Sequence, residues 1–77
     1  MYRKIILYTL VDCDRCKLVK QMLDVHEVRY ELVDDEQTLV DAGLAELSFP
    51  VMDVDGHRIE EYVDILSWLR RNNYYSL

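Results

Sequence analysis

The segment that decides the fold is IILYTLVDCDRCKLVKQML, residues 5–23. Residues 5–8, continued by Leu10 and Val11, are apolar without alternation, as expected for a central strand covered on both faces. Apolar side chains then recur at helical spacing, at Leu18, Val19, Met22 and Leu23. We therefore predict a helix over residues 14–25, with the only two cysteines of the chain at the point where strand gives way to helix.

Cys13 and Cys16 are three residues apart, which is about one helical turn. If a helix begins here, both sulfurs lie at its N-terminal end, where unpaired backbone N–H groups and a partial positive charge favour a thiolate. The thiolate is the nucleophile in thiol–disulfide exchange, and an unperturbed cysteine is only about 3% ionised at neutral pH. We interpret the pair as a redox-active dithiol, in which Cys13 attacks a disulfide and the deeper Cys16 resolves the mixed disulfide.

Length, charge and cysteine content restrict the possible functions. The 77 residues form a single domain, residues 1–77, in which we expect residues 72–77 to be a short tail. The formal net charge of −6 disfavours nonspecific nucleic-acid binding, and no apolar run approaches the length of a membrane span. We expect a cytoplasmic monomer. A disulfide across so short a loop restricts the unfolded chain little, so the cysteines are not a structural staple.

After the first helix, the sequence predicts a strand and a second helix. Residues 28–32 alternate apolar and polar side chains, the pattern of a half-buried strand. The acidic run at residues 34–36 supplies capping groups and negative charge for the start of a helix. The apolar positions of this helix form one stripe, at Leu39, Val40, Gly43, Leu44 and Leu47. Within it, Gly43 should weaken the helix by about 1 kcal/mol relative to alanine.

The C-terminal part predicts a hairpin and a last helix. Residues 51–54 and 57–59 flank Asp55-Gly56, which is a favoured pair for a two-residue hairpin turn. An amphipathic helix follows, with Tyr62, Ile65, Leu66 and Leu69 on its apolar face. The predicted order is βαβαββα, an α/β fold with a four-stranded mixed sheet flanked by three helices. Its first two strands should be parallel, because a helix connects them.

Three features together resemble the glutaredoxin family of thioredoxin-fold proteins. They are the strand that runs into Cys13 and Cys16, the Phe-Pro-Val step at residues 49–51, and the Val-Asp-Gly turn at residues 54–56 before the last helix. The resemblance covers residues 4–70. It implies a thioredoxin-like fold and thiol–disulfide oxidoreductase activity, with no bound cofactor beyond the dithiol. It also implies that Pro50 is cis beside the dithiol, that Phe49 and Pro50 position the substrate, and that Tyr62 borders the substrate groove.

The motif centre and the start of the last helix differ from the usual family pattern. Glutaredoxins usually have Cys-Pro-Tyr-Cys, whereas Asp14 and Arg15 fill the middle here, and we assign both to substrate contact. Family members also usually have two glycines near the last helix, where backbone N–H groups hold a glutathione carboxylate. This chain has Glu60-Glu61, and two glutamates would repel that carboxylate.

The short chain is also similar to the glutaredoxin-like redoxins that donate electrons to ribonucleotide reductase and are reduced by thioredoxin reductase. The substrate implied by this resemblance is a disulfide-containing protein or a small-molecule disulfide. Glutathione as a co-substrate and thioredoxin reductase both stay open as electron sources, with a slight preference for the protein reductase.

Two alternative functions use the same residues differently. Cys13 and Cys16 have the spacing of half a zinc site, which His26 and His57 would have to complete. However, His26 lies at the far end of the first helix, about 15 Å from Cys16 at the helical rise per residue. The other alternative is a non-catalytic interaction domain with incidental cysteines.

Overall fold

The computed structural model describes residues 3–75. The elements follow in the order β1 (Ile5–Tyr8), α1 (Asp14–Val25), β2 (Glu31–Val33), α2 (Glu36–Asp41), β3 (Val51–Val54), β4 (His57–Ile59) and α3 (Tyr62–Arg71). The predicted order βαβαββα is therefore confirmed, and α1 occupies the predicted residues 14–25.

The four strands form one mixed sheet in the order β2-β1-β3-β4. β1 is parallel to β2 and antiparallel to β3, while β3 and β4 form the predicted hairpin. The two turn residues of the hairpin, Asp55 and Gly56, have φ values of 53° and 86°, as a type I′ turn requires. The register pairs Tyr8, the last residue of β1, with Val51, the first residue of β3. The end of β1 and the start of β3 therefore lie at the same edge of the sheet.

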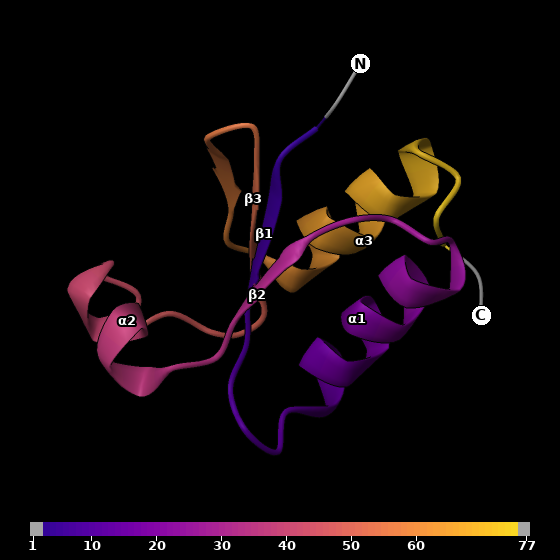
Figure 1. Cartoon of the computed structure of the whole chain (residues 1–77). Helices are drawn as coiled ribbons and strands as arrows, with labels where there is room; N and C mark the ends of the chain where they lie inside the picture. The colour runs from indigo at the N-terminus through magenta and orange to yellow at the C-terminus, as the bar shows by residue number, and fades with distance from the viewer. Residues whose placement is uncertain (1–2, 76–77) are drawn as a thin grey trace.

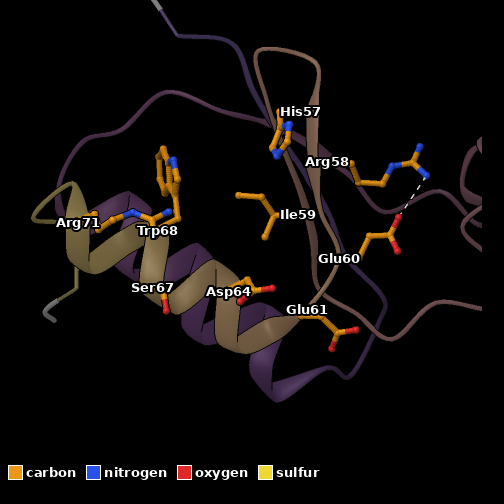
Figure 2. Close-up of a pocket in the computed structure, with 9 residues that line it drawn as sticks. All are labelled: His57, Arg58, Ile59, Glu60, Glu61, Asp64, Ser67, Trp68 and Arg71. Atoms are coloured by element: carbon orange, nitrogen blue, oxygen red, sulfur yellow. Dashed lines mark ion pairs between the residues drawn. The ribbon is translucent and has the colours of Figure 1, made fainter.

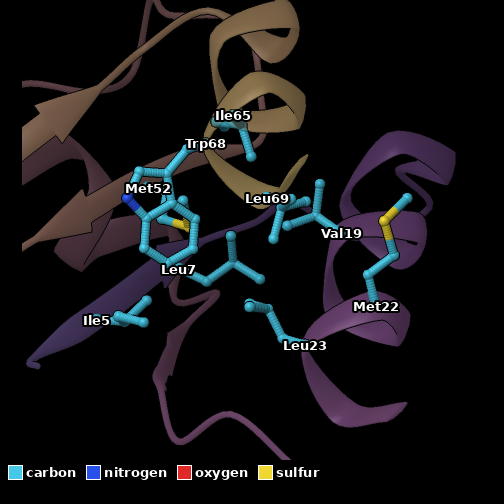
Figure 3. Close-up of a cluster of buried hydrophobic side chains, with 9 residues drawn as sticks. All are labelled: Ile5, Leu7, Val19, Met22, Leu23, Met52, Ile65, Trp68 and Leu69. Atoms are coloured by element: carbon cyan, nitrogen blue, oxygen red, sulfur yellow. The ribbon is translucent and has the colours of Figure 1, made fainter. Parts of the chain in front are cut away.

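Helices cover both faces of the sheet, with α1 and α3 on one side and α2 on the other (Figure 1). A hydrophobic core lies on each face of the sheet, and successive residues of the inner strands β1 and β3 point alternately toward one core and the other. The larger core, beneath α1 and α3, consists of Ile5, Leu7, Val19, Met22, Leu23, Met52, Ile65, Trp68 and Leu69 (Figure 3). The smaller core, beneath α2, contains Leu39, Leu44 and Val51, with Tyr8 packed against it. β1 is thus an inner strand with both faces covered, as predicted.

All three helices end with a residue of positive φ directly after the C-cap. These residues are Glu27 at 55°, Gly43 at 76° and Asn73 at 61°. In each case the following N–H returns to the last turn, as the Leu44 N–H does to the Leu39 carbonyl at 2.9 Å, which is the Schellman closure. The prediction that Gly43 lies within the second helix is therefore wrong. α2 ends at Asp41, and Gly43 supplies the left-handed backbone that terminates it.

The second strand is displaced from its predicted position. β2 covers Glu31–Val33 instead of residues 28–32, because the Val28 N–H binds the Leu23 carbonyl at 2.9 Å and so closes α1. The alternation across residues 28–32 therefore does not describe one strand. Leu32, which it placed on the buried side, is exposed.

The first strand is shorter than predicted. β1 ends at Tyr8, and Leu10 and Val11, which were expected to continue it, are 45% and 81% exposed. Thr9 makes the last backbone hydrogen bond to the neighbouring strand, to the Val33 carbonyl at 2.9 Å. Beyond Thr9 the chain leaves the sheet in order to enter α1, so these two apolar side chains have no layer above them.

Candidate active site

The two cysteines lie at the sheet edge where β1 passes into α1. Asp12 has a φ of 59° and turns the chain into the helix. Cys13 is the N-cap of α1, with extended backbone at φ −104° and ψ 108°. Cys16 lies in the first turn, and Val19, Met22 and Leu23 anchor the helix in the larger core. A strand and a helix that are both packed therefore hold the pair in place.

Cys13 and Cys16 are joined by a disulfide, with their Cα atoms 5.2 Å apart. The Cys16 backbone N–H donates to the Cys13 Sγ at 3.2 Å, so the sulfur occupies the place that a side-chain oxygen takes at an ordinary N-cap. Cys16 is 3% exposed, whereas Cys13 is half-buried. Both sulfurs thus lie at the helix start, with Cys13 the more accessible. The assignment of attack to Cys13 and resolution to Cys16 stays a prediction.

Phe49 and Pro50 lie against the dithiol. The Phe49–Pro50 peptide bond is cis, so this prediction is confirmed. The Phe49 carbonyl oxygen is 4.0 Å from the Cys13 Sγ, and Pro50 is buried. This proximity follows from the sheet register, because the pairing of β1 with β3 brings the residues before Val51 to the end of β1.

Arg15 connects the motif to the last helix. Its guanidinium carbon lies 5.0 Å from the centroid of the Tyr62 ring, a cation–π contact between α1 and the first residue of α3. Asp14, the first residue of α1, is exposed. Of the predicted site residues, both cysteines, Phe49 and Pro50 lie together at the dithiol. Arg15 and Tyr62 contact each other separately.

The start of α3 carries two carboxylates. Glu61 is the N-cap of α3, but its side chain makes no capping hydrogen bond. Glu60 forms a partly exposed ion pair with Arg58 at 3.9 Å, a contact that screening by water keeps weak. Both glutamates border a pocket of about 490 Å³ between β4 and α3, and none of its lining residues is a cysteine (Figure 2). Asp64, Arg58 and Arg71 also line this pocket, so groups of both charges border the start of α3.

Sequence reasoning missed part of the surroundings of the dithiol. A pocket of about 170 Å³ contains both cysteines, together with Thr9, Leu10, Val11, Asp12, Lys17, Lys20, Leu32 and Asp34. Leu10 and Val11 were assigned to a buried strand because the apolar run continues to the motif without a glycine or proline. Thr9 gives no sign of the strand's end, because a β-branched threonine is typical of strands.

The histidines do not approach the cysteines. His26 is the C-cap of α1 and contacts the Tyr74 ring, with centroids 5.8 Å apart, while His57 lies on β4. Among residues 3–75, no group of three or more His, Cys, Asp and Glu side chains is arranged to hold a metal ion. In the same part of the chain, no helix has the length and apolar character needed to cross a membrane.

Comparison with known proteins finds similarity at the level of structure. No family model matches the sequence, and no curated protein matches it. A Nu-class glutathione S-transferase from Haemonchus contortus superposes on 96% of this chain, with a TM-score of 0.76 and 21% sequence identity. A thioredoxin-like protein superposes on 86% of the chain, with a TM-score of 0.65 and 26% sequence identity. Glutaredoxin 1 from Francisella tularensis superposes on 97% with a TM-score of 0.64 and 16% identity. The chain has the thioredoxin fold.

The thioredoxin fold is shared by all three of these neighbours, but their lengths differ. The chain spans only 38% of the transferase, whereas it spans 97% of the thioredoxin-like protein and 100% of the glutaredoxin. The predicted thioredoxin-like architecture is therefore confirmed. Within this fold, a Cys-x-x-Cys pair at the start of the first helix supports thiol oxidoreductase chemistry in general.

Proposed function

We propose that the chain is a glutaredoxin-like thiol–disulfide oxidoreductase that reduces protein disulfides through Cys13 and Cys16. The observation that carries this proposal is the pairing of the two cysteines at the helix start, with the Cys16 N–H directed at the more accessible sulfur. A backbone donor in this position stabilises a thiolate on Cys13 once the disulfide is reduced. The cysteine that has to react first is thus the one that is both activated and accessible.

The reaction proceeds in two exchanges. The Cys13 thiolate attacks one sulfur of the substrate disulfide, forming a mixed disulfide and releasing the other substrate sulfur as a thiolate that takes up a proton. Cys16, after losing its proton, attacks the Cys13 Sγ, which forms the Cys13–Cys16 disulfide and releases the second substrate thiol. The substrate gains two electrons and two protons, and the protein ends in the disulfide form that the structure contains.

A protein reductase of the thioredoxin reductase class is the electron source that we propose, acting in the cytoplasm. Glutathione is the competing candidate, because neighbours of this fold include a glutaredoxin and glutathione S-transferases. The two carboxylates at the start of α3 argue against it, since they oppose an anionic tripeptide. By resemblance to the short redoxins, we propose a protein disulfide such as that of ribonucleotide reductase as the substrate, with the chain acting as a monomer.

The test is NADPH consumption by the purified protein with a model disulfide. One reaction contains glutathione and glutathione reductase, and the other contains thioredoxin reductase. We expect turnover with thioredoxin reductase and little with glutathione. Turnover with glutathione alone would replace the proposed electron source, and no turnover in either reaction would refute the oxidoreductase itself.

Cysteine variants assign the two roles. Cys13→Ser should abolish reduction, and persistent turnover in this variant would contradict the mechanism. Cys16→Ser should accumulate a mixed disulfide on Cys13, which mass spectrometry of the intact protein detects as a substrate adduct. An adduct on Cys16 in the Cys13→Ser protein that forms faster than the Cys13 adduct of the Cys16→Ser protein would reverse the assignment.

A further inference from the structure

Exposed apolar side chains gather around the dithiol. Among residues 3–75, seven large hydrophobic side chains are exposed, and four of them line pockets next to the β1–α1 connection: Leu10, Val11, Leu32 and Val40. Exposed apolar residues that cluster in this way mark an interaction site more often than scattered ones do. Leu10 and Val11 are exposed because β1 ends early, and together with their neighbours they form an apolar cluster of the kind that is typical of an interaction site.

The larger of these pockets is a groove between the β1–α1 connection and α2. It has a volume of about 370 Å³, and its apolar lining includes Leu10, Val11, Leu39, Val40, Leu47 and Phe49. Phe49 belongs to the groove and also places its carbonyl oxygen 4.0 Å from the Cys13 Sγ. A polypeptide whose cysteine reaches Cys13 therefore has this groove directly beside it.

The charge at the groove is of one sign. Asp34 and Glu36 are exposed and line it, while no lysine, arginine or histidine does. This polarity fits a partner with a basic side chain and opposes one with a carboxylate.

We infer that this groove is the docking site for the substrate protein, and that it takes a segment with an apolar side chain and a basic residue next to the reactive cysteine. The inference rests on the proposed oxidoreductase function and adds the substrate class. The apolar side chain enters between Val11 and Val40, and the basic residue pairs with the carboxylates of Asp34 and Glu36 at the rim. The groove lies on the α2 side of the dithiol, away from the carboxylates at the start of α3.

The experiment measures how fast the reduced protein reduces four peptide disulfides. Each peptide has a central cysteine flanked on both sides by leucine or serine, with lysine or glutamate at the outer positions. Each rate constant is divided by that of the same peptide with dithiothreitol, which removes differences in intrinsic thiol reactivity. A small aliphatic disulfide without flanking groups serves as the reference substrate. We expect the leucine–lysine peptide to have the highest normalised rate constant of the four. It should exceed that of the serine–glutamate peptide by about tenfold.

Variants of the groove connect this preference to the structure. Val40→Ser should lower the ratio of the leucine-peptide rate to the small-disulfide rate by about fivefold, because an apolar contact is lost. Val25→Ser is the matched control, since Val25 is 53% exposed, close to the 50% of Val40, but lies at the far end of α1. It should leave the ratio unchanged. Glu36→Lys should shift the preference from lysine toward glutamate peptides by about threefold, the size of an exposed charge pair.

The outcomes separate the inference from the proposed function. If no disulfide is reduced, the oxidoreductase function fails and the inference fails with it. If all substrates are reduced, but the four peptides react equally or Val40→Ser leaves their ratios unchanged, the docking site is wrong while the function stands. If leucine peptides are preferred but Glu36→Lys does not change the preference between lysine and glutamate peptides, the basic residue in the substrate is overturned. Sedimentation of a dimer that Val40→Ser dissociates would assign the groove to a second copy of the chain and overturn the inference.

Discussion

The stabilisation of a Cys13 thiolate can be measured directly in the Cys16→Ser variant. Serine removes the second sulfur but keeps the backbone N–H that lies 3.2 Å from the Cys13 Sγ. Two features favour the thiolate in the folded protein, namely this hydrogen bond and the position of Cys13 as the N-cap of α1. The carboxylates of Asp12 and Asp14 oppose it, but both residues are exposed, so water screens their effect.

The size of the effect follows from these contacts. A hydrogen bond to a charged group contributes about 1.5–3 kcal/mol, and a helix N-terminus adds about 0.3–1 kcal/mol. A net gain of about 1.5–3 kcal/mol corresponds to a thiolate-to-thiol ratio that is about ten to a hundred times higher than in the unfolded chain at the same pH. The pKa of the Cys13 thiol should therefore be lowered on folding.

The assay is the rate of alkylation by iodoacetamide as a function of pH, for the folded variant and for the same variant in denaturant. Folding should move the midpoint of the pH profile to lower pH. A folded midpoint at or above the unfolded one would refute the reasoning, because the N–H would then not be acting on the sulfur. The Cys13→Ser protein is the control, since its remaining thiol at Cys16 is 3% exposed and should react slowly.

The same shift predicts the pH dependence of stability in the Cys16→Ser variant. A thiol whose pKa is lowered on folding stabilises the folded state above its unfolded pKa, and this contribution is lost as the pH falls through the folded pKa. Denaturant unfolding of the variant should thus show a free energy that rises with pH between the two values. In the Cys13→Ser control, this rise should be absent.

Two further predictions concern stability outside the site. Gly43→Ala should lower the free energy of unfolding by about 1 kcal/mol, because a Cβ is strained at a φ of 76° even though the surrounding space is open. Gly43→Asn should lower the free energy of unfolding by less, and denaturant titrations of both variants check this. For Tyr30, burial and then the hydrogen bond that its hydroxyl donates to Asp24 at 2.7 Å raise the pKa above the ordinary range. The folded protein should therefore lose stability as the pH rises through and beyond the ordinary pKa range of tyrosine. Tyr30→Phe should lose less stability over the same pH interval, as measured by denaturant unfolding curves.

The elements that the sequence predicted well are those whose apolar residues form one periodic face. α1 and α3 bury Val19, Met22, Leu23, Ile65 and Leu69 in the larger core, and the helical spacing of these residues is visible without any tertiary information. The hairpin was predicted from local chemistry, since Asp55 and Gly56 take the positive φ values that the turn requires. In both cases, a short stretch of sequence determines the structure.

The errors lie where apolar residues continue past the end of an element. Leu44 is fully buried in the smaller core, but it reaches that core after the left-handed turn at Gly43 and not as part of the helix. Val28 packs against the larger core while its N–H closes α1. Periodicity records which residues are apolar, but it does not record whether the backbone between them is still regular.

For the candidate site, the motif predicted the chemistry-bearing residues but not the surface around them. The positions of Cys13 and Cys16 follow from the helix start, and the cis bond before Pro50 follows from the resemblance. The exposure of Leu10 and the groove beside α2 depend on where β1 ends and how α2 packs, which are tertiary facts. No local pattern in the sequence contains them.

The topology explains why chemistry and substrate choice can be separated in this molecule. Because β1 is antiparallel to β3 and Tyr8 pairs with Val51, the residues that end β1 and precede β3 must meet at one edge of the sheet. This requirement brings Cys13 and the Phe49 carbonyl together through backbone pairing alone. The side chains of Leu10 and Val11 are not needed for that pairing, so they are free to serve another purpose. Substitutions in the groove should therefore change which disulfides are reduced while Cys13 keeps its position at the helix start.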